Sequence, residues 1–190
     1  MLNQKLFARL KKEYDAYGAA RRELIGVSNG ALSKAKQAIF ALHRDDEKDA
    51  GQLLSEVEST FARLEKEFKK NDGLRWEGAY RAALEEYVEA KLFYDFSKYG
   101  KIGEIKTVLL DADGYLAGLS DFTGELTRKA VQRATQGKTE EVEKLAKVVR
   151  DVVEQLIQFD LTGYLRTKYD QAKQNLRRVE EVLYDIKMRR

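Results

Sequence analysis

Proline is absent from all 190 residues of the chain, whereas an average protein of this length carries about nine. Proline is the residue that most effectively ends a helix, because it has no N–H donor and its ring clashes with the preceding turn. Long helices are therefore permitted everywhere. Apolar residues recur at every third or fourth position through most of the chain, which is typical of amphipathic helices. We find no convincing β-strand.

The positions of capping residues and glycines predict where these helices begin and end. A first long helix begins near Asn3, and Asp45 or Asp46 caps a second one that ends before the turn at Asn71–Gly73. The first helix contains glycines at which it either bends or allows another helix to approach closely, namely Gly18, Gly26 and Gly30. Thr139 is predicted to cap a later helix. The remaining predicted helices cover about residues 74–98, a short stretch up to 110, 111–136, 139–157 and 161–188.

These segments predict one all-α domain over residues 1–190, a bundle of six to seven helices with no linker and no internal repeat. The chain is long enough to enclose a sizeable core. In the last helix, apolar residues from Leu165 to Ile186 alternate at spacings of four and three, as in a coiled-coil seam. The last two helices carry broad apolar faces, which suggest contacts between subunits as well as a core.

Composition excludes several classes of site and location. There is no cysteine and only one histidine, His43, so a metal ion must be held by oxygen ligands, which favours Mg²⁺, Mn²⁺ or Ca²⁺. We interpret His43 as a hydrogen-bonded packing residue rather than a ligand. Charged residues make up 35% of the chain, and no apolar run approaches the ~20 residues that span a bilayer. The N-terminus lacks the apolar run of a signal peptide. We therefore expect a cytoplasmic protein with no membrane partner.

Two acidic pairs stand out on predicted helices. Glu86 and Glu89 lie about 60° apart around one helix, and Asp121 and Glu125 lie about 40° apart around another, at ~100° per residue. The helix that carries the glutamates is apolar on most sides, and such helices are usually buried on most sides. We therefore expect Glu86 and Glu89 to be partly removed from water.

If the two helices are neighbours, the four carboxylates converge with Arg128 beside them. Unneutralised carboxylates repel one another, and a divalent cation is their natural counter-charge. Such a site can activate water and neutralise charge on a phosphate oxygen, while an arginine holds the phosphate. Gly124, inside the second helix, suggests a close approach by another helix. Spacing alone leaves the alternative open that these acids face solvent and bind nothing.

A second group could contact nucleic acid. Arg75, Trp76 and Arg81 combine two cations with an aromatic ring, a combination that binds phosphates and stacks bases. The same pattern is equally typical of the solvated start of a helix, so both interpretations remain open.

Several segments together resemble the translin and translin-associated factor X family. Tyr115–Arg128 resembles the family signature, Ser33–Arg44 its first helix in the factor X branch, and Glu86–Ala90 the acidic motif of that branch. Leu165–Asp170 and Arg178–Asp185 resemble its last helix. The matches occur in order along nearly the whole chain, which makes the set far more specific than any one segment.

The resemblance implies an all-helical, translin-like subunit that assembles into a closed, usually octameric, barrel around single-stranded RNA or DNA. The factor X branch implies a Mg²⁺-dependent endoribonuclease, with Mn²⁺ as an alternative ion. Its carboxylates match Glu86, Glu89, Asp121 and Glu125. The small size resembles an archaeal version that builds the barrel from one kind of subunit. The positions that carry basic residues in the family match Arg128, Arg166 and Lys168, whereas the basic segment of translin is thinned to Arg75, Trp76 and Arg81.

Two other functions remain open at this point. The first alternative is a non-catalytic, translin-like protein that binds single-stranded RNA or DNA and uses the carboxylates structurally. The second is a helical hydrolase of small nucleotides. Its sequence cue would be Glu-x-x-Glu pairs on several helices, and such a pair occurs only once here in a suitable setting.

Overall fold

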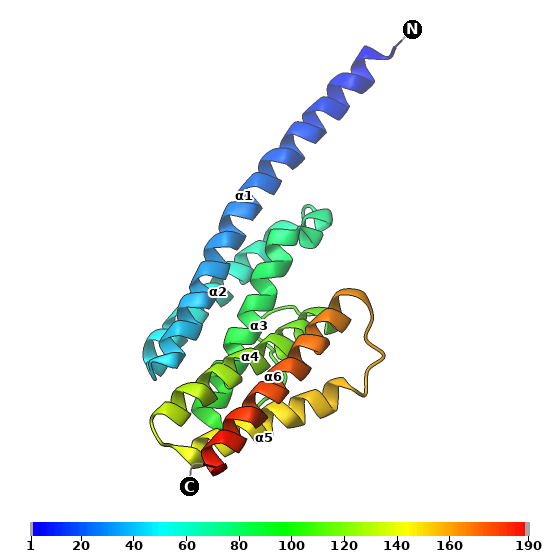
Figure 1. The fold of residues 1–190 in the computed structure, drawn as a ribbon. Coiled ribbons are helices and arrows are strands. Elements are labelled where there is room, and N and C mark those ends of the chain that lie inside the picture. Colours follow the sequence, from blue (N-terminus) through cyan, green and yellow to red (C-terminus); the bar gives the residue numbers. More distant parts are fainter. Residues whose placement is uncertain (1, 189–190) are drawn as a thin grey trace.

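The computed structural model describes residues 2–188, and in that range the chain forms six α-helices, one 3₁₀-helix and no strand (Figure 1). The predicted all-α class is confirmed. No helix in the described range is long and apolar enough to cross a membrane. The helices are α1 (Gln4–His43), α2 (Glu47–Phe68), the 3₁₀-helix η1 (Asp72–Trp76), α3 (Gly78–Tyr99), α4 (Ala112–Thr135), α5 (Thr139–Leu156) and α6 (Gly163–Met188).

Helix α1 is one continuous helix of 40 residues. The Asn3 side chain accepts a hydrogen bond from the Leu6 N–H at 3.2 Å, which fixes the start where the sequence predicted it. Of the two alternatives that the sequence left open at Gly26 and Gly30, a bend or a close approach, the close approach is not found within the described chain, because no other helix lies within 4 Å of a Cβ built there. Every residue from 2 to 17 is exposed and none of residues 18–23 is buried, and this first half of α1 extends away from the body of the molecule (Figure 1).

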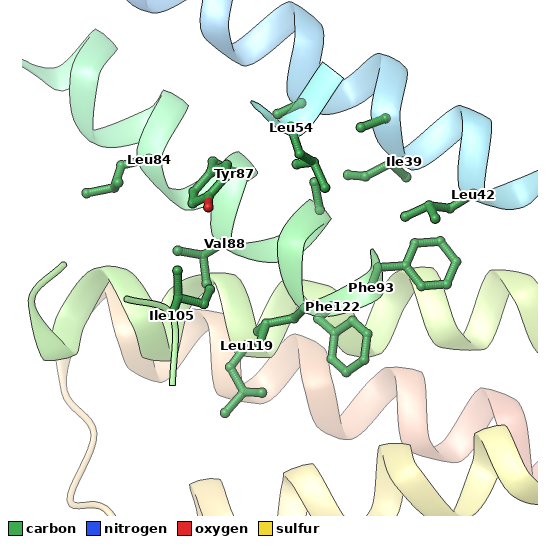
Figure 2. Packing of buried hydrophobic residues seen from close by; sticks show 14 of the residues in the cluster. Ile39, Leu42, Leu54, Leu84, Tyr87, Val88, Phe93, Ile105, Leu119 and Phe122 are labelled. Carbon is green, nitrogen blue, oxygen red and sulfur yellow. The ribbon is translucent and has the colours of Figure 1, made fainter. Parts of the chain in front are cut away.

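Helix α3 lies between the α1–α2 pair and α4, and its side chains fill much of the core (Figure 2). Tyr87 of α3 and Phe122 of α4 are fully buried. The Phe61 ring of α2 packs edge-on against Tyr80 and Tyr87, with 5.6 Å between ring centroids in each pair. Edge-to-face packing of this kind stabilises a core beyond the area that it buries. The core therefore fixes the position of α3, which carries two of the predicted carboxylates.

Helices α3 and α4 cross at Gly118. A Cβ atom at this position would lie 2.6 Å from Val88 Cβ and 2.9 Å from the Glu85 carbonyl oxygen, so only glycine fits the crossing. The sequence pointed instead to Gly124 as the site of close approach. A Cβ at Gly124 would meet the Asn175 side chain of α6 at 3.4 Å, which is an ordinary contact.

Three local predictions are wrong. The short helix up to Leu110 does not form, because residues 101–111 follow an irregular path after Gly100, whose φ of +65° ends α3. Thr139 is the first residue of α5, and the preceding N-cap, Lys138, makes no side-chain capping bond. The predicted helix over residues 74–98 is divided, since Glu77 is extended between η1 and α3.

The seam of α6 is part of the core. Tyr169, Ala172 and Val179 are buried, and the helix packs against α4 and α5. Its coiled-coil spacing therefore describes packing within the chain. Helix α6 also brings Lys168 beside α3 and α4, where the predicted carboxylates lie.

Candidate active site

The crossing of α3 and α4 brings the two acidic pairs to face one another. Glu86 and Glu89 project from α3, and Asp121 and Glu125 project from α4. Burial raises the pKa values of both glutamates, and the charges of Asp121 and Glu125 add to the shift, so all four carboxyl groups lie within electrostatic reach of one another. The predicted site required α3 and α4 to be neighbours, and the two helices are in contact.

Glu89 is the most buried member of this group. Its relative exposure is 9%, and no hydrogen bond or ion pair to it is found among residues 2–188. Burial raises the pKa of its carboxyl from 4.5 to about 9, and the three nearby carboxylates add to the shift. Glu89 therefore carries a proton at neutral pH in the metal-free protein.

Asp121 is paired with a lysine from α6. Lys168 Nζ lies 2.5 Å from Asp121 Oδ2 and 2.6 Å from Glu85 Oε1, so one ammonium group joins two carboxylates. Burial raises the pKa of Asp121, and the hydrogen bond from Lys168 opposes this shift. Burial alone would lower the pKa of Lys168, but the hydrogen bonds to both carboxylates outweigh it and raise that pKa.

Helix α1 supplies partners to the other two carboxylates. Lys36 Nζ lies 3.8 Å from Glu86 Oε2. His43 Nε2 forms a short hydrogen bond with Glu125 Oε2, and Arg128 lies 3.7 Å from the same oxygen. Burial raises the pKa of Glu86, and the charge of Lys36 opposes that shift. Three of the four carboxylates are thus balanced by basic side chains, and the fourth is protonated.

His43 is held in place by a buried lysine of α4. Lys129 Nζ donates to the carbonyl oxygens of Leu42 and His43, at 2.8 and 3.3 Å, and to Asp45 Oδ1 at 2.7 Å. These bonds satisfy carbonyl groups that the end of α1 leaves without partners. The His43 ring also packs against Phe93, with 5.1 Å between centroids. His43 is therefore a hydrogen-bonded packing residue, and it also orients Glu125.

Sequence reasoning missed Glu85, Lys36 and the contact between His43 and Glu125. One signal was present, because Lys36 and His43 are seven residues apart and so share a face of α1. Nothing in the sequence showed that this face meets α3 and α4.

The donor atoms suit a hard cation, but they do not form a ready-made set of ligands. Among the described residues, no three Asp, Glu or His side chains are arranged to hold a metal ion. The reason is visible in the contacts above: Glu86, Asp121 and Glu125 are turned toward basic partners. Their oxygen chemistry fits Mg²⁺ or Mn²⁺, and such an ion would have to replace these partners.

The basic residues predicted to contact nucleic acid differ in how exposed they are and in how closely they pair with carboxylates. Arg128 is half exposed and lies over the Phe40 ring, 4.9 Å from its centroid. Arg166 pairs with Asp170 on the surface of α6 at 3.3 Å. Arg75 binds both oxygens of Glu65, at 2.7 and 2.8 Å. Two further pairs, Lys168 with Asp121 and Arg81 with Asp111, complete the set. Among these residues, Arg128 is the one placed beside the carboxylates with an exposed guanidinium.

Comparison with known proteins now decides the family. The model of the translin family matches residues 19–190. The chain belongs to the translin family. Translin-associated protein X of Mus musculus is 24% identical over 225 residues, which cover 96% of this chain and 78% of that protein. An uncharacterized protein of Methanocaldococcus jannaschii is 25% identical over 169 residues, covering 86% of this chain and 70% of the relative.

Solved structures share the same fold. The crystal structure of apo-NeC3PO superposes with a TM-score of 0.87 at 24% sequence identity, covering 98% of both chains. A complex of AfC3PO with duplex RNA superposes with a TM-score of 0.83 at 22% identity, covering 97% of both chains. The arrangement of helices in this translin-family chain is therefore that of the C3PO subunits.

Proposed function

We propose that this translin-family protein is a metal-dependent endoribonuclease that cleaves single-stranded RNA inside a homo-oligomeric barrel. The observation that carries the proposal is the group of four carboxylates at the α3–α4 crossing, one of them buried and with a pKa of about 9. Burying such a group costs free energy, and perturbed carboxyl groups of this kind cluster at functional sites. The fold is similar to that of AfC3PO in its complex with duplex RNA, and this similarity supports RNA as the substrate.

Glu86, Glu89, Asp121 and Glu125 would hold Mg²⁺, with Mn²⁺ as the alternative ion. The bound ion would activate a water molecule and neutralise charge on the phosphate. Glu89 has to lose its proton before it can serve as a ligand, because carboxyl groups bind metals in the ionised form. Arg128 is placed to hold the phosphate, since its exposed guanidinium lies 3.7 Å from Glu125. Lys168 and Arg166 on the adjoining α6 would add positive charge once they are released from Asp121 and Asp170.

The proposed assembly is a closed barrel of identical subunits, an octamer by analogy with the family. The exposed half of α1 supports assembly, because five large apolar residues lie in water on the single chain: Leu6, Phe7, Leu10, Tyr14 and Tyr17. Contiguous apolar surface of this kind is typical of an interface.

A non-catalytic protein that binds single-stranded RNA or DNA is the second candidate. It is favoured by one observation: cationic side chains already pair with Glu86, Asp121 and Glu125. In that case the carboxylates would have a structural role, and metal ions would be unnecessary.

The Glu125→Gln variant separates the two candidates. RNA cleavage in Mg²⁺ should fall at least about a hundredfold, the scale of losing an essential catalytic group, while the assembly keeps its mass in solution. Glu140→Gln, an exposed change on α5, is the matched control and should cleave like the parent. EDTA should abolish cleavage by the parent. Undiminished cleavage by Glu125→Gln would remove the proposed site, and binding of RNA without cleavage in either metal would favour the second candidate.

A further inference from the structure

A large cavity opens beside the carboxylates, on the side of α6. Its volume is 820 Å³, and its wall is formed by α3, the start of α4, the connection between α5 and α6, the start of α6 and Leu32 of α1. Glu86 and Asp121 belong to this wall. We call it the lateral cavity, defined by Glu85, Glu86, Asp121, Phe159, Tyr164 and Lys168. Any group that occupies it lies next to the proposed site of cleavage.

The charges of the lateral cavity are unsuited to a phosphate. Five carboxylates line it, against the cations of Arg81 and Lys168. Both cations are already paired, Arg81 with Asp111 and Lys168 with Asp121 and Glu85. A phosphate group would be repelled by the unpaired acids. A neutral and partly apolar group is therefore the better occupant, and the neutral part of a nucleotide is its base.

Two exposed aromatic rings line the same cavity. Tyr164 is 60% exposed and Phe159 is 51% exposed. The Tyr164 ring is nevertheless held in place, because its hydroxyl donates to Glu85 Oε1 at 2.7 Å. An exposed ring in a fixed position is a platform on which a base can stack without further loss of side-chain freedom.

The free hydrogen-bonding groups in the wall are mainly acceptors. Asp113 and Asp160 line the cavity, and neither carboxylate forms a hydrogen bond or ion pair with any residue in the described range. Carboxylates accept hydrogen bonds and cannot donate them. They can bind the exocyclic amino group of adenine, cytosine or guanine, whereas uracil has no such group.

We propose that the lateral cavity is a nucleobase subsite, which receives the base next to the scissile phosphate and prefers amino-bearing bases to uracil. This inference rests on the proposed function, because it places the base beside the carboxylates that would act on the phosphate. Tyr164 and Phe159 stack on the base, and the carboxylates of Asp113 and Asp160 accept hydrogen bonds from the amino group at its edge. The preference makes cleavage depend on the base at one position.

The first test uses oligouridine RNA that carries one adenosine, and the same RNA with an abasic residue at that position. Equal cleavage beside the adenosine and beside the uridines of the same strand would overturn the preference for amino-bearing bases. The parent should cleave beside the adenosine at least about tenfold faster than beside the abasic residue, the scale of one stacked base. Tyr164→Leu with Phe159→Leu should reduce this ratio to about threefold or less. Both positions are exposed, so the fold tolerates the changes. The control is Tyr184→Leu, a tyrosine of α6 that is 64% exposed outside the cavity, and it should keep the parent ratio.

A second measurement does not depend on cleavage. RNA with 2-aminopurine in place of the adenosine is mixed with the Glu125→Gln variant in EDTA, and stacking should quench its fluorescence unless Tyr164 and Phe159 are also replaced. Cleavage by the parent with equal rates at adenosine and abasic residue would overturn the subsite and leave the nuclease proposal intact. Quenching that requires the two rings, without cleavage by the parent, would support the subsite and overturn the nuclease. Absence of both overturns both.

Discussion

Glu89 shows how one side chain can report on the state of the whole site. Its carboxyl is buried among three others and holds a proton up to about pH 9. In the unfolded chain its pKa returns to about 4.5. Between these two values the folded state binds a proton that the unfolded state has lost. The free energy of unfolding therefore falls as pH rises through this window. Glu89 contributes most favourably to stability below the pKa that its carboxyl has in the unfolded chain.

Replacing Glu89 by Gln should remove this pH dependence. In EDTA, thermal unfolding followed by circular dichroism should show the variant more stable than the parent around pH 8, by about 1–3 kcal/mol, the cost of a poorly compensated buried polar group. The two proteins should converge near pH 4, where both carry a neutral side chain. Glu140→Gln, at an exposed position, should follow the parent at every pH. If the stability of Glu89→Gln and of the parent changes equally with pH, Glu89 is ionised in the folded protein.

Lys168 acts as the internal counter-ion of Asp121 and Glu85. Its replacement by Met should destabilise the protein in EDTA by about 1–3 kcal/mol, because two partly buried carboxylates lose their partner. Mg²⁺ should then restore more stability in the variant than in the parent, since the ion no longer competes with an ammonium group. Thermal shifts across a Mg²⁺ titration measure both effects. A variant that responds to Mg²⁺ no more than the parent would show that Lys168 and the metal do not share Asp121. Lys173→Met is the control, because Lys173 pairs with Asp170 on the surface of α6.

At the residue scale, the sequence predicted the four carboxylates with Arg128 beside them, but not the other basic groups that pair with them. Helical spacing tells which residues share a face, so each acidic pair was visible. The partners Lys36, His43 and Lys168 come from α1 and α6, and the choice among many basic residues depends on how these helices cross. His43 illustrates the limit: its packing role was predicted, whereas its contact with Glu125 depends on the end of α1 lying against α4.

At the scale of the helices, Gly118 determines how closely α3 and α4 approach. Gly118→Ala should destabilise the protein by about 1–3 kcal/mol, because the new methyl group would overlap Val88 and the Glu85 backbone. Gly124→Ala is the matched control on the same helix. It should be neutral or stabilise by up to about 1 kcal/mol, since alanine is the better helix former and its Cβ would meet only the flexible side chain of Asn175. Chemical denaturation of both variants in EDTA tests this contrast. Equal stability of the two variants would show that α3 and α4 can separate at little cost.

Helix positions were largely predictable, and the failures have specific causes. Apolar periodicity reports the burial of one face, so the long helices were found. It does not report whether a short segment has enough partners to become helical, and residues 101–111 remain irregular between Gly100 and the Asp111 cap. A mid-helix glycine also does not show which neighbour requires it. Gly118 and Gly124 look alike in sequence, and only the crossing distinguishes them.

At the scale of the whole molecule, the single chain leaves its longest helix half uncovered. None of residues 2–23 is buried, and at ~1.5 Å per residue the helical part of this segment, residues 4–23, extends about 30 Å. Hydrophobic burial is the main favourable term in association, so this surface is the natural contact for another subunit. The sequence predicted an oligomer through family resemblance and through the apolar faces of the last two helices, not through α1. The number of subunits depends on the angle between neighbouring chains, which no helical pattern encodes.

The exposed half of α1 can be tested directly through the mass of the assembly. Phe7 and Leu10, 52% and 45% exposed, lie on it three residues apart, and replacing both by Glu would place unpaired charges in any apolar interface. Light scattering should show the parent as an oligomer and the double variant as a much smaller species with the same helical content. Lys12→Glu is the control for a changed charge on the same exposed segment, and it should assemble like the parent. If the double variant keeps the parent mass, α1 does not hold the subunits together. Loss of RNA cleavage together with loss of mass would show that the active form is the assembly, and that the carboxylates of one chain act only when its neighbours enclose the RNA.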